Sequence, residues 1–377
     1  MPMKDLKLPT NQILLGNNTE VLAKIPDNSI DSIVTDPPYE IAFMAKKWDN
    51  VGAAYSAVLW AHCFRVLKPG GHIIAFGATR TVHRLACSIE DAGFEIRDTI
   101  SWLYFSGFPK SLNISKGIDK HYGADREVDV DITAPATPEA KEWDGWGTGL
   151  KPSQEPAILA RKPIAEKNIC LQVLKTGTGA INIDGCRFAY GDPCWVGPQC
   201  KTGSRLTNTG SPFSKNSNDE TAETFIENNL GRWPANIYQC KKPSRSERDQ
   251  GLDHLAPTLG SDAVQRKPDS AGINNPRAGA GRTAETVKNF HPTVKPVDLM
   301  RWLVRLVTPP KGVVLDPFAG SGSTLVAATL EGIDSIGIEI TPEYLPIITG
   351  RVKDAEYQYK LSRAQITFGD WMDGLYD

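Results

Sequence analysis

The sequence has 377 residues, of which 40% are hydrophobic and 23% charged, with a formal net charge of −2. This composition is typical of a globular protein and excludes a disordered chain, and no apolar run approaches the roughly 20 residues of a membrane span. The segment Met1–Lys7 lacks the apolar core of a secretory signal, so we expect a cytoplasmic protein.

Strands and helices alternate over residues 1–163. Apolar runs predict strands at Gln12–Leu15, before Asp36, and at His72–Phe76, Phe94–Tyr104 and Pro156–Arg161, with helices near Glu20–Lys24 and at Ala53–Leu67 and Thr81–Ala92. Such alternation predicts an α/β fold, in which helices cover both faces of a sheet.

The first candidate site follows the strand Ser32–Thr35 and has the sequence Asp36-Pro37-Pro38-Tyr39. The two prolines lack backbone donors, so the main chain here offers carbonyl acceptors beside the Asp36 carboxylate. A planar amine could donate one N–H to Asp36 and one to the Pro37 carbonyl, while its ring stacks on Tyr39. Taken alone, this tetrapeptide fits an amine-binding site and a proline-rich turn equally well.

Residues 164–290 differ from the rest. After a helix predicted within Ile164–Leu174, long stretches rich in Gly, Ser, Asn, Thr and Pro lack hydrophobic periodicity. Long unpatterned loops are usually functional or disordered, and this region carries 16 Lys+Arg against 13 Asp+Glu, a net of +3. We interpret it as a target-recognition region, with a flexible insertion as the alternative.

The C-terminal part, residues 291–377, contains the second candidate site. A short strand, Val313–Leu315, precedes the glycine-rich turn Asp316–Gly322 and a helix that runs to Leu330. Glycines allow close approach of a ligand, and a helix N-terminus can hold a carboxylate or phosphate. Glu339, at the end of the next strand, can accept hydrogen bonds from ribose hydroxyls. A dinucleotide site fits less well, because Leu325 stands where G-x-G-x-x-G requires its third glycine.

These motifs resemble those of the S-adenosylmethionine-dependent DNA amino-methyltransferases. Asp36–Tyr39 is similar to the catalytic D-P-P-Y motif and Phe318–Gly322 to the cofactor motif F-x-G-x-G. The segment His291–Pro296 resembles the stretch that precedes the cofactor strand in the β-ordered group, where the catalytic motif comes first and the cofactor motif last. Three further stretches resemble phage and prophage members: Gly107–Ser111, Glu155–Pro163 and Gly231–Asn236.

The resemblance implies a Rossmann-like, seven-stranded methyltransferase sheet with a circularly permuted motif order and one antiparallel edge hairpin. It implies a catalytic domain formed by residues 1–163 and 291–377, interrupted by the recognition region 164–290. It also implies S-adenosylmethionine as the cofactor, in a bacterial cell or phage-infected host. The cofactor-binding residues that it suggests are Asn17, Asp36, His291, Thr293, Lys295, Asp316, Phe318, Gly320, Ser321, Gly322, Ser323, Thr324 and Glu339.

Individual functions follow from the same resemblance. Thr293 and Lys295 would meet the methionine carboxylate, and Asp316 its ammonium. Asn17 stands where the family often has Asp and would contact the cofactor adenine; a turn asparagine is the alternative. Asp36 favours N6 methylation of adenine, because members that methylate the N4 amine of cytosine usually have Ser at this position. An inactive, DNA-binding relative and a protein or ribosomal RNA amine methyltransferase are the further alternatives.

Double-stranded DNA is the partner that we expect, while a homodimer and a restriction endonuclease partner stay open. The loop after the catalytic turn, with Lys46, Lys47 and Trp48, is a candidate to close over the substrate strand. Phosphate contacts are expected at Lys241, Lys242, Arg245 and Arg248. Four cysteines could surround zinc, namely Cys186, Cys194, Cys200 and Cys240. Their irregular spacing favours reduced thiols, so we predict no metal site.

Overall fold

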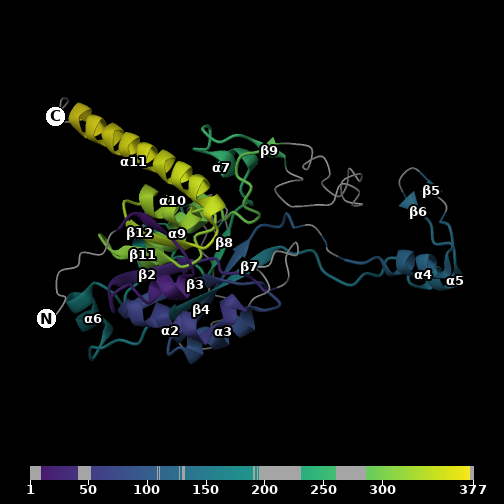
Figure 1. Ribbon diagram of the computed structural model, residues 1–377, viewed down its shortest axis with the longest axis horizontal. Helices are drawn as coiled ribbons and strands as arrows, with labels where there is room; N and C mark the ends of the chain where they lie inside the picture. Colours follow the sequence, from purple (N-terminus) through teal and green to yellow (C-terminus); the bar gives the residue numbers. More distant parts are fainter. Residues whose placement is uncertain are drawn as a thin grey trace, which may run out of the picture.

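The computed structural model describes residues 10–40, 52–107, 109, 111–126, 128–129, 132–189, 192, 194, 231–259 and 286–373. Its centre is one eight-stranded sheet (Figure 1). The strands lie in the order β1 (Gln12–Leu15), β12 (Asp334–Glu339), β11 (Val313–Asp316), β2 (Ile30–Thr35), β3 (Leu67–Phe76), β7 (Gln154–Arg161), β4 (Glu95–Leu103) and β8 (Ile237–Gln239).

Strand direction confirms a doubly wound α/β fold. The five strands from β1 to β3 are parallel, β7 is antiparallel to both of its neighbours, and β8 is parallel to β4. Two details differ from the expected seven-stranded sheet. The antiparallel strand β7 lies inside the sheet, and an eighth strand, β8, is added by the region interpreted as target recognition. Three residues of β8 pair with Ser101–Leu103, a match too short to be recognised from periodicity alone.

Alternating side chains divide the core into two layers. Ile33, Ile73 and Leu315 face a cluster that includes residues of α2 (Ala57–Val66) and α3 (Val82–Asp91). Their neighbours Val34 and Ile74 face the other cluster, with α9 (Val297–Val307) and α10 (Ser323–Leu330). This two-residue alternation is the pattern of strands buried on both faces. Figure 1 shows α2 and α3 on one side of the sheet and α9, α10 and α11 (Leu345–Asp373) on the other.

The remaining helices have modest capping signals. Asn17 caps α1 (Asn18–Leu22) and Asn168 caps α6 (Ile169–Thr176), each accepting a backbone N–H through its side chain. Between β4 and β7 a lobe stands away from the sheet, formed by α4 (Ile114–Tyr122), α5 (Pro138–Glu142) and the ladder β5–β6 (Val128–Asp129 and Ile132–Thr133). Sequence patterns predicted only an irregular stretch there. Among the described residues, none of the helices combines the length and apolarity needed to cross a bilayer.

The remaining described elements are short and lie outside the main sheet. They are the 3-10 helices Ala53–Tyr55, Asp184–Cys186 and Pro342–Tyr344, the helix α7 (Arg245–Asp249), and the two-stranded ladder β9–β10 (Thr258–Leu259 and Thr286–Val287). The division of the chain at residues 163 and 290 stays a prediction.

The contact between α9 and residues 184–188 gives the first testable prediction. Trp302 on α9 is 5% exposed, stacks on Phe188 with ring centroids 5.8 Å apart, and donates its indole N–H to the Cys186 carbonyl at 3.1 Å. Trp302→Ala should lower the free energy of unfolding by about 3–5 kcal/mol, because it removes a large buried ring. Denaturant unfolding measures this. The control Trp146→Ala, at a side chain 61% exposed on the lobe, should change it by less than about 0.5 kcal/mol.

Candidate active site

Both candidate motifs lie at the same edge of the sheet. Asp36 directly follows β2, Asp316 ends β11 and Glu339 ends β12. These strands are adjacent and parallel, with Leu315 opposite Ile33, so their carboxyl ends meet at one crevice. Thr35 donates its hydroxyl to Asp316 across 2.6 Å and thereby links the two motifs directly.

The Asp36 carboxylate belongs to a buried polar network. Its Oδ2 atom lies 2.6 Å from Lys295 Nζ, and the same ammonium lies 3.1 Å from Glu155 Oε2. The Tyr39 hydroxyl donates to Glu155 at 2.8 Å and accepts from Lys295 at 2.9 Å. The tetrapeptide is therefore held by two side chains from distant parts of the chain, one at the start of β7 and one before α9.

The second oxygen of Asp36 has a different environment. Among the described residues, Oδ1 is a buried atom with no hydrogen-bond partner. A buried acceptor of this kind is costly, and such exceptions are concentrated at functional sites. Asp36 therefore presents one oxygen to the protein and keeps the other available to an external donor.

Burial and neighbouring charges shift the pKa values of all four groups in this network. Burial raises the pKa of Asp36, Lys295 opposes this rise, and Glu155 adds to it. Burial also acts against the charged forms of Lys295 and Glu155, but the opposite charges around them together outweigh it: Asp36 and then Glu155 raise the pKa of Lys295, and Lys295 and then Lys242 lower that of Glu155. Burial, followed by the charges of Asp36 and Glu155, raises the pKa of Tyr39 well above its usual range. At Asp36, therefore, burial favours the neutral carboxyl and the Lys295 ammonium favours the charged one.

The glycine-rich turn is shaped to approach a ligand. Gly320 and Gly322 have φ angles of +53° and +77°, in the left-handed region that favours glycine. The Glu339 carboxylate accepts from the backbone N–H groups of Gly320 and Thr341, each at 2.8 Å, and each of its oxygens retains acceptor capacity for a hydroxyl. Gly322, the N-cap residue of α10, has no side chain to cap the helix, so the first N–H groups of α10 can serve an external acceptor such as a carboxylate.

His291 closes one side of this turn. A Cβ atom on Gly320 would lie 2.9 Å from His291 Nε2, so the imidazole packs directly on the glycine. Its Nδ1–H donates to the Thr293 carbonyl at 2.5 Å, which leaves Nε2 as the unprotonated nitrogen. Burial lowers the pKa of His291 to about 3, so the ring is neutral at physiological pH.

Asp316 is more enclosed than the sequence suggested. It is 2% exposed, and its oxygens accept from the hydroxyls of Thr35 and Thr324, each at 2.6 Å, and from the N–H of Phe318. Burial raises its pKa to about 6, against the effect of these hydrogen bonds. In this structure Asp316 links β2, β11 and α10, and its contact with a methionine ammonium stays a prediction.

Two residues of the site were missed by sequence reasoning. Glu155 belongs to a stretch noted only for its resemblance, and it reaches the site because the antiparallel β7 starts at the edge where its neighbours end. Arg351, on α11, is 3% exposed and donates to the carbonyl and hydroxyl of Ser321 and to the hydroxyl of Ser323, at 2.7–3.2 Å. A charged residue followed by an apolar strand was a usable signal for Glu155, whereas no local pattern singles out Arg351.

Two other residues that were predicted to bind the cofactor contact protein groups in this structure. The Lys295 ammonium lies between Asp36 and Glu155, and its contact with the methionine carboxylate of the cofactor stays a prediction. Asn17 accepts from the N–H and the hydroxyl of Thr19, at 3.0 and 2.6 Å, which is the geometry of a helix cap. A contact of Asn17 with the cofactor adenine stays a prediction.

The proposed phosphate-binding run lies close to both motifs. Lys242 Nζ is 3.8 Å from Glu155 Oε1 and 4.1 Å from the centre of the Tyr104 ring. Arg248 donates to the His291 carbonyl at 2.6 Å, and Arg245 donates to the Thr286 carbonyl. Lys241 is exposed. Lys46, Lys47 and Trp48 lie outside the described residues.

The cysteines give no sign of a metal site in the part of the chain that the structure describes, where no group of three or more ligand side chains gathers. Burial raises the pKa values of Cys186, Cys194 and Cys240 to about 12, so their thiols stay protonated. Cys200 lies outside the described residues.

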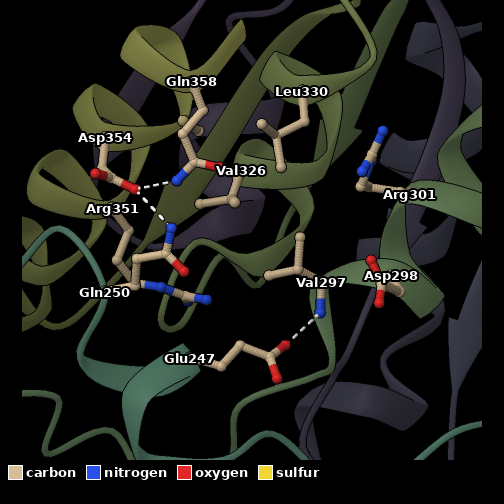
Figure 2. Close-up of a pocket in the computed structure, with 11 residues that line it drawn as sticks. Glu247, Gln250, Val297, Asp298, Arg301, Val326, Leu330, Arg351, Asp354 and Gln358 are labelled. Atoms are coloured by element: carbon tan, nitrogen blue, oxygen red, sulfur yellow. Dashed lines mark hydrogen bonds between the residues drawn. The ribbon is translucent and has the colours of Figure 1, made fainter. Parts of the chain in front are cut away.

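A cavity of about 240 Å³ lies among α7, α9, α10 and α11 (Figure 2). Figure 2 shows that Glu247 accepts from the Val297 N–H, and that Asp354 accepts from Gln250 and Gln358. None of the site residues suggested by the sequence lines it. Arg351 lines this cavity and also donates hydrogen bonds to the glycine-rich turn. The cavity is therefore adjacent to the candidate site.

Comparison with protein families identifies the chain. A family model described as DNA methylase, of the N6 and N4 amino-methyltransferases, matches residues 30–350 and so includes both motifs. The chain belongs to this family. Its methyl donor is S-adenosylmethionine, and the turn around Gly320, the acceptors of Glu339 and the uncapped start of α10 fit the ribose and carboxylate groups of this cofactor.

Individual relatives are more distant. Type II methyltransferase M.HindIII of Haemophilus influenzae is 25% identical over 277 residues, which cover 73% of this chain and 61% of that protein. M.ScaI of Streptomyces caespitosus is 38% identical over 84 residues, which cover 22% of this chain and 27% of that one. The matches thus span less than two thirds of these relatives. Among solved structures, PvuII DNA methyltransferase (cytosine-N4-specific) shares 15% identity over 92% of both chains, with a TM-score of 0.46.

The second prediction tests the glycine-rich turn. Gly320→Ala should weaken S-adenosylmethionine binding by roughly tenfold, because a left-handed alanine costs about 1–2 kcal/mol and its Cβ would displace His291. Gly123→Ala is the matched control: Gly123 has a similar φ of +67° but nothing within 4 Å of the added carbon. Calorimetric titration with S-adenosylmethionine measures the affinity of each variant. Equal affinities in the two variants would contradict a cofactor site at this turn.

Proposed function

We propose that the protein methylates the N6 amine of adenine in double-stranded DNA. The observation that carries this proposal is the buried Oδ1 of Asp36, which has no hydrogen-bond partner among the described residues, in a tetrapeptide that also supplies the Pro37 carbonyl and the Tyr39 ring. An exocyclic amine has two N–H donors, and these two acceptors match them in number. Adenine rather than cytosine is proposed because the tetrapeptide opens with Asp. An N4-cytosine specificity is the alternative, and the same acceptors would suit it.

The chemistry needs little besides positioning. The lone pair of the N6 amine is delocalised into the ring, and hydrogen bonds from both N–H groups favour a more pyramidal, nucleophilic nitrogen. S-adenosylmethionine supplies an activated methyl group when bound. Asp36 and Pro37 orient the amine, and Asp36 Oδ1 can take the proton that the methylated nitrogen releases.

The target base has to leave the duplex to reach this edge of the sheet. Extrusion costs a few kcal/mol, and stacking on Tyr39 can return roughly 1–3 kcal/mol. Hydrogen bonds to Glu155 and Lys295 fix the Tyr39 hydroxyl, so its ring is held in place before the base arrives. The β-ordered, phage-like placement within the family, a homodimer and a restriction partner stay predictions.

The third prediction concerns the product. Purified protein with S-adenosylmethionine and DNA should form N6-methyladenine, which nucleoside mass spectrometry identifies. Asp36→Ala should abolish methylation and leave cofactor affinity within about threefold, since Lys295 retains Glu155 as a charged partner. Formation of N4-methylcytosine would overturn the base assignment, and the absence of any methylated base would favour the inactive, DNA-binding alternative.

The fourth prediction concerns the loop that follows the catalytic turn. Lys46→Ala combined with Lys47→Ala should raise the DNA KM and reduce the salt slope of DNA binding by up to about 2, because each phosphate contact contributes about 0.9. Lys24→Ala with Lys311→Ala is the control; both lysines are exposed and precede β2 and β11, at the opposite edge of the sheet. An unchanged slope in the first double variant would move the phosphate contacts to residues 241–248.

A further inference from the structure

Lys295 is a buried cation of the candidate active site, with 7% of its side chain exposed. An ammonium has three N–H donors, and Lys295 has three polar partners: Asp36 Oδ2 at 2.6 Å, Glu155 Oε2 at 3.1 Å and the Tyr39 hydroxyl at 2.9 Å. Aromatic rings enclose it as well, since its Nζ lies 4.7 Å from the centre of the Phe76 ring. Such a cation is strongly held and has no surplus donor for another anion.

Glu155 is the second carboxylate that contacts the Lys295 ammonium. Its Oε2 receives both the Lys295 ammonium and the Tyr39 hydroxyl, and Lys242 lies 3.8 Å from its Oε1. Without Glu155, the Tyr39 hydroxyl would lose the acceptor that it meets at 2.8 Å. Glu155 therefore fixes two groups at once, the counter-ion of Asp36 and the ring on which a base would stack.

We propose that Lys295 and Glu155 are positioning residues for methyl transfer: Lys295 holds Asp36 by its Oδ2 atom and so leaves Oδ1 for the target amine, and Glu155 anchors Lys295 and Tyr39. The inference deepens the proposed function and rests on it. It differs from the function that resemblance gives to Lys295, which is contact with the cofactor carboxylate.

The electrostatics of the site give the two residues opposite effects. Asp36 faces the charged or titratable groups Lys295, Glu155, Tyr39 and Asp316. Glu155 additionally faces Lys242 and Tyr104. Burial raises the pKa of Asp36, the ammonium lowers it, and Glu155 raises it. Loss of Lys295 must therefore make Asp36 easier to protonate, whereas loss of the Glu155 charge must make it harder to protonate.

The experiment compares Lys295→Met with Glu155→Gln. Asp36 has to be ionised to take the proton that the methylated amine releases, so the acid limb of the pH profile of kcat/KM reports its titration in the free enzyme. Lys295→Met should move this limb up by roughly one to three pH units, and Glu155→Gln should move it down. Affinity for S-adenosylmethionine should stay within about threefold of the wild type in Lys295→Met.

Matched controls separate these effects from loss of stability. Lys162 is 9% exposed and donates to Asn28 and to the carbonyls of Phe64 and Leu67. Lys162→Met removes a buried lysine far from Asp36 and should leave the pH profile in place. Glu95, which pairs with Arg161 at the other end of β7, is the control for the carboxylate, as Glu95→Gln.

Three outcomes would overturn the inference. They are an unchanged acid limb in both variants, shifts of the same sign, and a cofactor affinity at least tenfold weaker in Lys295→Met, which would assign Lys295 to the cofactor. If Lys295→Met does not fold, Glu155→Gln keeps an acceptor for Tyr39 and tests the sign alone. Infrared titration of Asp36 in the cofactor-free protein gives the same comparison without turnover. It therefore distinguishes failure of this inference from failure of the proposed methylation.

Discussion

The parallel pairing of β2 with β11 is the contact on which the site depends. It joins segments about 280 residues apart, and Thr35 and Asp316 bond across it at a sequence separation of 281. Because both strands end at the same edge, a turn rich in acceptors and a turn rich in glycine come to lie at one crevice. Neither turn could form a bisubstrate site alone. Asp316 reinforces the pairing from within, by holding Thr35 on one side and Thr324 of α10 on the other.

Burying charge at this edge requires compensation, and the structure provides it from several elements. Two carboxylates of the catalytic network share the Lys295 ammonium, and Arg351 holds the glycine-rich turn through Ser321 and Ser323. Buried ion pairs contribute little to stability in general, since desolvation offsets their attraction. Their value here is geometric, because they fix Asp36 and Tyr39 before any base is present.

Much of the framework could be predicted because its signals are local. The strands at Ile30–Thr35 and Val313–Asp316 fall where apolar runs placed them, and the next strand, Asp334–Glu339, ends at Glu339 as expected. The Asp36 turn was recognised because proline restricts the backbone, and the Gly320 turn because glycine allows backbone angles that other residues avoid. Both effects depend only on residue type.

The remainder depends on tertiary contacts that no local pattern encodes. Glu155 enters the site only because β7 runs antiparallel to its neighbours, and Lys295 contacts one carboxylate after the end of β2 and one at the start of β7, on either side of β3. The strand β8 is three residues long, and the helices of the lobe between β4 and β7 have only nine and five residues. Arg351 lies 30 residues after the serine that it contacts. It becomes a buried donor to this serine only because α11 packs against α10.

The most direct test of the account is a crystal structure of the protein with S-adenosylhomocysteine and a DNA duplex that contains its methylation site, identified by sequencing DNA from cells that express the protein. The account predicts an extruded adenine, its N6 atom within hydrogen-bonding distance of Asp36 Oδ1 and the Pro37 carbonyl and its ring against Tyr39. A target base that stays stacked in the duplex, or an amine bound away from Asp36, would contradict the central claim that the ends of β2 and β11 form one methyl-transfer site.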